Sequence, residues 1–213
     1  MAVRETTPRT WLFFASILAA WIFAWVVKIH LRIPALESAT GGFLYWTVAK
    51  IYLWLLPSLW WIRRTNRSWR DVLRFDSPFR WIGWGAGLGL GVAALNIAWN
   101  LHSGQAWFPR RFDLALLNIL VVAPLLEEFL VRGAILGALR GEIGFCRANI
   151  ATAAMFVGLH VPGWYFMGSL QANLVRFDGA ASVFLIGLVA GYATKNGRSV
   201  LSGMLFHFLN NLT

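Results

Sequence analysis

Charged residues are scarce in this chain: they make up 13% of its 213 residues, whereas 58% are hydrophobic. A soluble domain carries about a quarter charged residues. Apolar runs recur at lengths near the roughly 20 residues that a helix needs to cross hydrocarbon. These runs are continuous, whereas a transmembrane barrel requires short segments of alternating polarity. The composition therefore predicts an all-α, polytopic transmembrane helical bundle.

Cysteine is almost absent, since Cys146 is the single one in the chain. One thiol cannot form an internal disulfide, and it cannot build a cluster of thiolate metal ligands. The sequence also contains no internal repeat, no low-complexity tract and no segment that reads as a soluble domain. We therefore expect residues 1–213 to form a single membrane-embedded domain.

About seven apolar segments are expected to cross the bilayer. They are residues 11–27, 43–62, 81–100, 114–139, 148–167, 180–194 and 200–212. Arginines crowd the 63–80 loop and basic residues recur at 140–147 and 195–198, whereas the opposite loops hold few, such as Arg32 and Arg110. The positive-inside rule then places the N-terminus in the cytoplasm. The net charge of +10 is thus interpreted as a topology signal and not as nucleic-acid binding.

Small residues spaced four apart on the predicted spans indicate close helix packing in lipid. Gly187 and Gly191 form such a pair, and Gly133 and Gly137 form another. A short surface helix that carries Trp69 is also expected within the basic 63–80 loop. These features describe packing and indicate no particular activity.

Polar residues interrupt the later spans in three groups. Ionisable side chains are costly at membrane depth, so they usually mark a functional cavity where they occur. Counted from the basic loops at about 1.5 Å per residue, Glu127, His160 and His207 lie roughly 20, 20 and 13 Å deep. We therefore expect the groups to share one layer. They comprise Glu127, Glu128 and Arg132; His160, four residues after Phe156; and His207 with Asn211.

The first group contains two carboxylates with different surroundings. Glu128 and Arg132 are four residues apart and share a helix face, as an ion pair requires. A purely structural ion pair would explain these two residues. Glu127 points about 100° away and has no local partner. We therefore expect Glu128 to be held by Arg132 and Glu127 to be free to act as a base.

The other two groups supply imidazoles and an amide. His207 and Asn211 project from one helix face, and both can donate hydrogen bonds to a developing oxyanion. The structural alternatives are polar contacts between helices for this pair and a packing role for His160. Carboxylates, two histidines and an amide are together the groups needed to activate water and stabilise an oxyanion. The sequence thus predicts an intramembrane protease.

Three motifs resemble those of the CPBP family, which includes type II CAAX prenyl endopeptidases, bacteriocin-processing enzymes and abortive-infection proteins. They are Glu-Glu-Phe-Leu-Val-Arg-Gly at 127–133, Phe-Val-Gly-Leu-His at 156–160 and His-Phe-Leu-Asn-Asn at 207–211. The resemblance covers about residues 113–213, the half that carries the catalytic motifs. It implies a helical intramembrane endopeptidase of glutamate type.

The resemblance also implies roles for individual residues. Glu127 with His160 would activate a water, His207 and Asn211 would bind the oxyanion, and Glu128 with Arg132 would support the site. Two histidines and a glutamate could ligate zinc, but the sequence has no His-Glu-x-x-His motif, so we favour a site without metal or other cofactor.

The expected partners are the lipid bilayer and a membrane-anchored or lipidated protein or peptide, either prenylated or bearing a C-terminal sorting signal. The expected location is a prokaryotic plasma membrane. The main alternative is a non-catalytic membrane binding or immunity module that retains the polar cluster. A proton-coupled transporter is disfavoured because the chain lacks an internal repeat.

Overall fold

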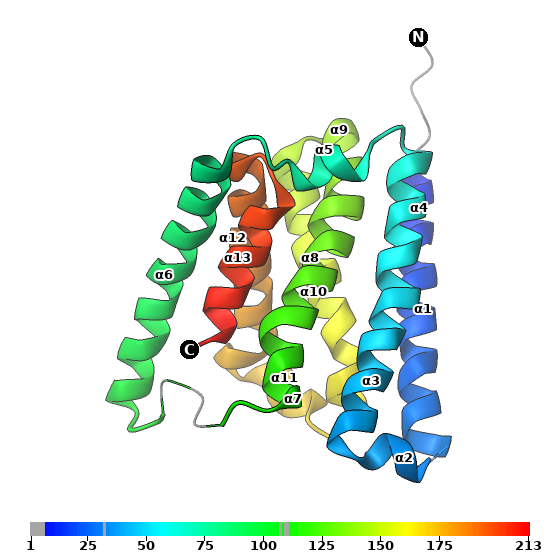
Figure 1. The fold of residues 1–213 in the computed structure, drawn as a ribbon, viewed down its shortest axis with the longest axis vertical. Coiled ribbons are helices and arrows are strands. Elements are labelled where there is room, and N and C mark those ends of the chain that lie inside the picture. The colour runs from blue at the N-terminus through cyan, green and yellow to red at the C-terminus, as the bar shows by residue number, and fades with distance from the viewer. Residues whose placement is uncertain (1–6, 32, 107, 109–110) are drawn as a thin grey trace.

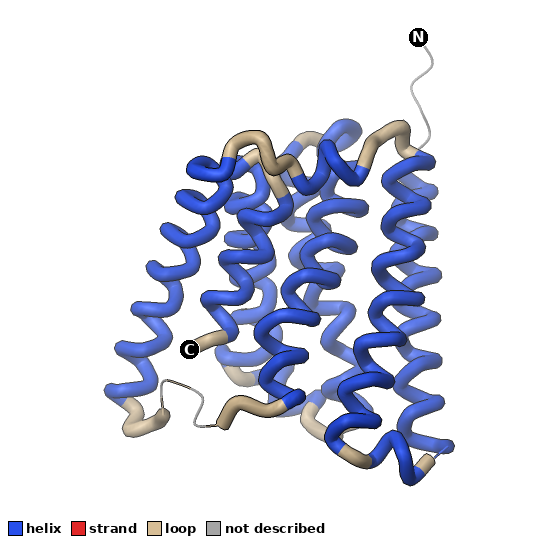
Figure 2. Tube along the Cα trace, in the orientation of Figure 1, coloured by secondary structure: helices blue, strands red, loops and turns tan. Residues whose placement is uncertain are grey.

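The protein is described here by a computed structural model of residues 7–31, 33–106, 108 and 111–213, and every element in these ranges is helical. Arg32 and Arg110, two basic residues predicted on one side of the membrane, lie outside the described residues. Figures 1 and 2 show long helices that run side by side, with the connecting segments at the two ends of the bundle. The predicted all-α class is confirmed.

Each predicted span falls on a helical segment, and several of these segments combine α-helix with π-helical turns (η). In chain order they are α1 (Thr7–Leu31); α3 (Ala39–Lys50), η1 (Ile51–Leu55) and α4 (Leu56–Arg64); α6 (Pro78–His102); α7 (Leu114–Leu117), η2 (Asn118–Val122), α8 (Ala123–Glu128), η3 (Phe129–Leu136) and α9 (Gly137–Ile143); α10 (Phe145–Phe166); η4 (Phe177–Ala181) and α12 (Ser182–Gly197); and α13 (Val200–Asn211). The connecting helices are α2 (Pro34–Glu37), α5 (Trp69–Leu73) and α11 (Leu170–Val175).

Among the described residues, four segments are long and apolar enough to cross a membrane: Arg9–Leu31, Pro78–His102, Leu114–Ile143 and Phe177–Gly197. Other predicted spans are helical but shorter or less apolar; α13, for example, has only 12 residues. The count of about seven spans and the side on which the N-terminus lies therefore stay predictions.

The basic loops gather at one end of the bundle. Figure 1 places α5, α9 and the junction between α12 and α13 at the same end, close to the start of α1. This arrangement agrees with the prediction that the basic loops share one side. The expected surface helix is α5, which begins with a capping box formed by Ser68 and Asp71.

Two π-helical turns are each followed by a proline. The N–H of Leu56 donates to Ile51 O, and that of Ala123 donates to Asn118 O. The next residue in each case is a proline, which has no N–H to continue the ladder. One backbone carbonyl before each proline therefore loses its helical donor, and in the second case this carbonyl is that of Ile119.

Glycines set the spacing of two helix pairs. A methyl group at Gly85 of α6 would lie 2.7 Å from the backbone oxygen of Ser202 in α13, so these helices are in close contact. Gly187 of α12 packs on Ala153 of α10, and Gly191 packs on Asn149 of the same helix. The predicted close packing along the sixth span is therefore observed.

The second glycine pair has a different role from the one predicted. Gly133 lies against Val72 of α5, and Gly137 lies against the guanidinium of Arg67. These glycines make room for a surface helix and for a loop side chain, and not for a neighbouring spanning helix. The spacing pattern could not distinguish these cases because it depends only on the helix that carries it.

Candidate active site

A buried carboxylate connects three helices. Arg132 donates from Nη1 to Oε1 of Glu128 at 3.1 Å, and neither side chain is exposed. The same oxygen lies 3.0 Å from Nδ1 of His207 in α13. Arg132 also donates from Nη2 to the backbone oxygen of Gly187 in α12, at 2.7 Å. The predicted Glu128–Arg132 pair is present, and its link to His207 is an addition that the sequence did not reveal.

Phe156 lies at the centre of the three motifs. The guanidinium of Arg132 lies 4.6 Å from the centroid of the Phe156 ring. The centroids of the His160 and His207 rings lie 4.8 and 5.6 Å from the same centroid. The Phe156 side chain is buried, with 2% of its surface exposed. Residues from α10, η3 and α13 therefore meet in one layer, as their predicted depths indicated.

The orientation of the His160 ring is fixed by its own helix. Its Nδ1 lies 2.8 Å from the backbone oxygen of Phe156. Because a carbonyl oxygen only accepts, Nδ1 carries the proton of this hydrogen bond. In the neutral ring Nε2 then holds the lone pair, so this half-buried side chain presents a proton acceptor.

Glu127 differs from Glu128 in both partner and exposure. It retains 8% of its surface exposed, whereas Glu128 has none. Its Oε1 lies 3.9 Å from Nζ of Lys50 in α3. The Lys50 ammonium donates to Oδ1 of Asn118 at 3.0 Å and lies 5.4 Å from the Trp54 ring centroid.

Lys50 is therefore a counter-charge that the sequence analysis missed. Glu127 indeed has no partner on its own helix, but a lysine from another helix lies beside it. The available signal was a lone lysine inside the predicted span 43–62, because a buried cation there requires a partner. Both histidines contact the Phe156 ring, and His207 also binds Glu128, the residue next to Glu127.

Asn211 is held by the carbonyl that Pro124 leaves free. Ala123 donates to Asn118, and Pro124 has no N–H, so the Ile119 oxygen lacks both its α-helical and its π-helical donor. Nδ2 of Asn211 donates to that oxygen at 2.9 Å. His207 and Asn211, which were expected to act together, thus contact α8 and η2 of the same helical run.

Glu127, His160 and His207 have the side-chain types that could ligate zinc. Within the part of the chain that the structure describes, no three His, Cys, Asp or Glu side chains form a group suited to a metal ion. The ammonium of Lys50 also lies beside Glu127, where it would compete with a bound cation.

Comparison with known proteins gives one match. Residues 109–213 match the family described as Rce1-like type II CAAX prenyl endopeptidase. No curated protein and no solved structure matches the chain. The matched region contains Glu127, His160, His207 and Asn211, whereas Lys50 precedes it. Together with its apolar helices, the match identifies an integral membrane protein whose residues 109–213 carry a domain of the CPBP family of CAAX-type proteases.

Proposed function

We propose that this protein is an intramembrane endopeptidase of glutamate type. The observation that carries the proposal is the convergence of the three motifs on the Phe156 ring, where Arg132, His160 and His207 all contact it. Membership of a protease family supports the reaction class. The ring is contacted by an acceptor imidazole and by hydrogen-bond donors, and Glu127 adds a carboxylate next to Glu128, which binds both Arg132 and His207. These are the groups that peptide hydrolysis requires.

In the proposed reaction Glu127 and His160 activate a water molecule. The Glu127 carboxylate accepts the proton of the water while the water oxygen attacks the scissile carbonyl carbon. Nε2 of His160 is the second acceptor, because its Nδ1–H is engaged by Phe156. The proton then passes to the leaving amine as the carbon–nitrogen bond breaks. One hydrogen of the water thus leaves on the amine product, and the remaining hydroxyl leaves on the carboxylic acid product.

His207 and Asn211 stabilise the oxyanion of the tetrahedral intermediate in this proposal. Nδ1–H of His207 is directed to Glu128, so its Nε2 must also carry a proton to donate to an oxyanion. The Glu128 carboxylate supplies the counter-charge for that form of the ring. Asn211 uses one amide hydrogen on Ile119 and retains the other for the oxyanion.

Glu128 and Arg132 act as positioning residues. Arg132 holds Glu128, and Glu128 orients His207, so neither has to touch the substrate. Both side chains are buried and bonded to other groups of the protein, which agrees with a role in holding the site. Lys50 balances the charge of Glu127 in the same proposal.

The proposed substrate is a membrane-anchored or lipidated protein or peptide that is cleaved near a terminus. The matched family is described by its action on CAAX prenyl proteins, which supports a prenylated substrate. A C-terminal sorting signal is the other form of anchored substrate. The proposed location is a prokaryotic plasma membrane, crossed several times by the chain, and the proposed reaction uses no metal.

The experiment that tests the proposal compares protein termini in host membranes that carry the intact protein, Glu127→Gln or Glu142→Gln. The two variants make the same change, but Glu142 lies at the exposed end of α9. We expect new termini with the intact protein and with Glu142→Gln, and none with Glu127→Gln. These termini would also identify the substrate and the cleavage site.

The amount of each variant in the membrane is measured in parallel, so that a failure to insert is not mistaken for a loss of activity. His160→Ala should behave like Glu127→Gln. If a well-inserted Glu127→Gln yields the same termini as the intact protein, the protease proposal is wrong. A cellular phenotype that also survives this substitution would favour the non-catalytic binding or immunity module.

A further inference from the structure

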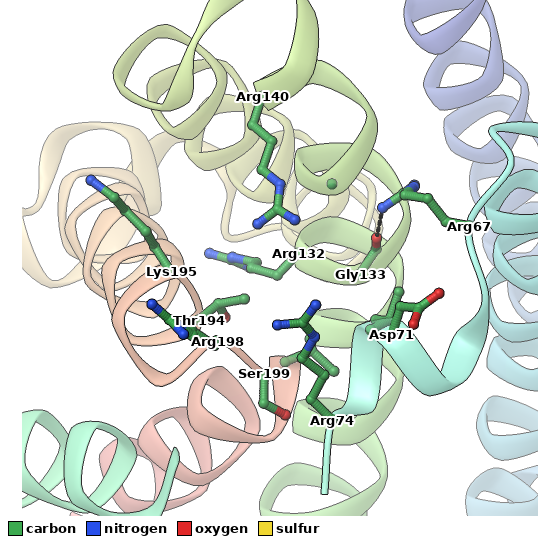
Figure 3. A pocket seen from close by; sticks show the side chains of 13 residues that line it. Arg67, Asp71, Arg74, Arg132, Gly133, Arg140, Thr194, Lys195, Arg198 and Ser199 are labelled. Atoms are coloured by element: carbon green, nitrogen blue, oxygen red, sulfur yellow. Dashed lines mark hydrogen bonds between the residues drawn. The ribbon is translucent and has the colours of Figure 1, made fainter. Parts of the chain in front are cut away.

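A polar cavity lies at the basic end of the bundle, and Glu127 is not among the residues that line it (Figure 3). Its volume is about 310 Å³. It is enclosed by α5, α9, the end of α12 and the start of α13, and basic side chains dominate its wall. These side chains are Arg67, Arg74, Arg132, Arg140, Lys195 and Arg198.

Most of this positive charge is not neutralised. Within the described residues, no carboxylate pairs with Arg74, Arg140 or Arg198. Figure 3 shows Arg74, Arg132 and Arg140 pointing toward one space. Asp71 is the single carboxylate of the wall, and it accepts a hydrogen bond from the Ser68 N–H at 3.1 Å.

Arg67 shows how crowded the cations are. It donates to the backbone oxygens of Gly133 and Ala134 at 2.9 and 2.7 Å, which fixes its guanidinium in the wall. Burial, with repulsion from Arg140 as the second cause, lowers the pKa of Arg67 to about 10. A cluster of like charges held this closely is stabilised by an anion between them.

Arg132 provides an independent sign of a missing partner. Its Nη1 and Nη2 bond to Glu128 and Gly187, but its buried Nε has no acceptor. The residue is only 2% exposed and lines the cavity. A buried donor without a partner is costly, so an acceptor supplied by a ligand would satisfy it.

The start of α13 adds to the same field. Ser199 caps this 12-residue helix, and Ser199 and Val200 line the cavity. The N-terminus of a helix carries partial positive charge and exposes N–H groups, which favours bound anions. Buried Thr194 Oγ1, which also lacks a partner, is a further polar group of the wall.

We propose that this cavity binds a phosphate group, carried either by an anionic lipid headgroup or by a soluble phosphate compound. Planar guanidinium groups match phosphate oxygens in charge and in hydrogen-bond geometry. The positive-inside rule accounts for basic residues at this end, such as exposed Arg63 and Arg147, but not for the convergence of several on one cavity. Because Arg132 also holds Glu128, the bound phosphate would contact the framework of the candidate active site.

The test uses the full-length protein in phosphatidylcholine nanodiscs, titrated with inorganic phosphate by calorimetry. A second arm uses nanodiscs that contain phosphatidylglycerol, and lipid retained by the protein is measured by native mass spectrometry. Arg140→Gln and Arg74→Gln remove single charges from the cavity, and Arg63→Gln removes one at the same end but outside it. All these arginines are exposed, so the variants should fold, which thermal unfolding checks.

We expect the cavity variants to weaken phosphate or phosphatidylglycerol binding about tenfold each, while Arg63→Gln leaves it unchanged. Saturable binding of inorganic phosphate would identify a soluble ligand as the source. Retention of phosphatidylglycerol alone would identify the lipid headgroup. The proposal is overturned if neither probe binds, or if Arg63→Gln weakens binding as much as the cavity variants. No arm measures proteolysis, so this result is independent of the proposed protease activity.

Discussion

Lys50 Nζ lies 3.9 Å from Glu127 Oε1, and the two side chains are similarly closed to solvent, at 9% and 10% exposed. This separation gives electrostatic attraction but exceeds the length of a hydrogen bond. The ammonium donates instead to Asn118 at 3.0 Å. Lys50 therefore balances the charge of Glu127 while leaving both carboxylate oxygens free for water.

We expect Lys50→Gln to lower kcat/KM by about tenfold to a hundredfold, because the Glu127 carboxylate then lacks its nearest counter-charge. Lys28→Gln is the matched control, since Lys28 pairs at 2.8 Å with Glu37, which is 60% exposed and distant from the site. Peptide cleavage by both variants is measured in the same nanodiscs. Equal activities would show that Lys50 has no role in the reaction.

Glu128→Gln should destabilise the fold by about 3–5 kcal/mol, because it leaves the buried Arg132 guanidinium without its counter-charge. Arg176→Gln is the comparison, since it breaks an ion pair whose side chains are 66% and 64% exposed and should change nothing measurable. Unfolding in detergent, followed by circular dichroism, gives both values. A Glu128→Gln protein as stable as the intact one would contradict the structural role of this pair.

Pro124→Ala should lower kcat about tenfold. The new N–H can donate within the helix, which would deprive Asn211 of the Ile119 oxygen that holds it. A double-mutant cycle with Asn211→Ala measures the coupling between these positions. We expect the second substitution to add little once the first is present. Additive losses would mean that the two residues act independently.

Gly85→Ala should destabilise the protein by about 1–3 kcal/mol, because the new methyl would lie 2.7 Å from the Ser202 backbone oxygen. Gly87→Ala is the control on the same helix, where a methyl meets nothing within 4 Å. It should be neutral or stabilising, by up to about 1 kcal/mol. Thermal unfolding of both variants tests whether α6 and α13 are packed this closely.

Proteolysis should survive removal of divalent metal ions by a strong chelator. The physical reason is that the Lys50 ammonium already supplies a positive charge beside Glu127, where a bound metal ion would otherwise supply it. Activity is measured before and after dialysis against the chelator, and again after zinc is added back. A loss that zinc restores would assign the metal a role and contradict the proposal.

Two elements of the fold and site could be derived from the sequence because they depend on neighbouring residues. Hydropathy along the chain determined the helical membrane class, and helical periodicity determined the pairing of Glu128 with Arg132. Counting along single helices also predicted that the polar groups share one layer, and the contacts of Arg132, His160 and His207 with Phe156 agree with that prediction.

The tertiary structure decided the contacts between helices that are distant in sequence. Only the packing of α3, α8 and α13 shows that Lys50 balances Glu127, that His207 binds Glu128 and that Asn211 binds Ile119. It also shows that arginines of separate loops line one cavity. Periodicity fixes which residues share a face of one helix, but the rotation and contact of neighbouring helices depend on side-chain packing across the whole bundle.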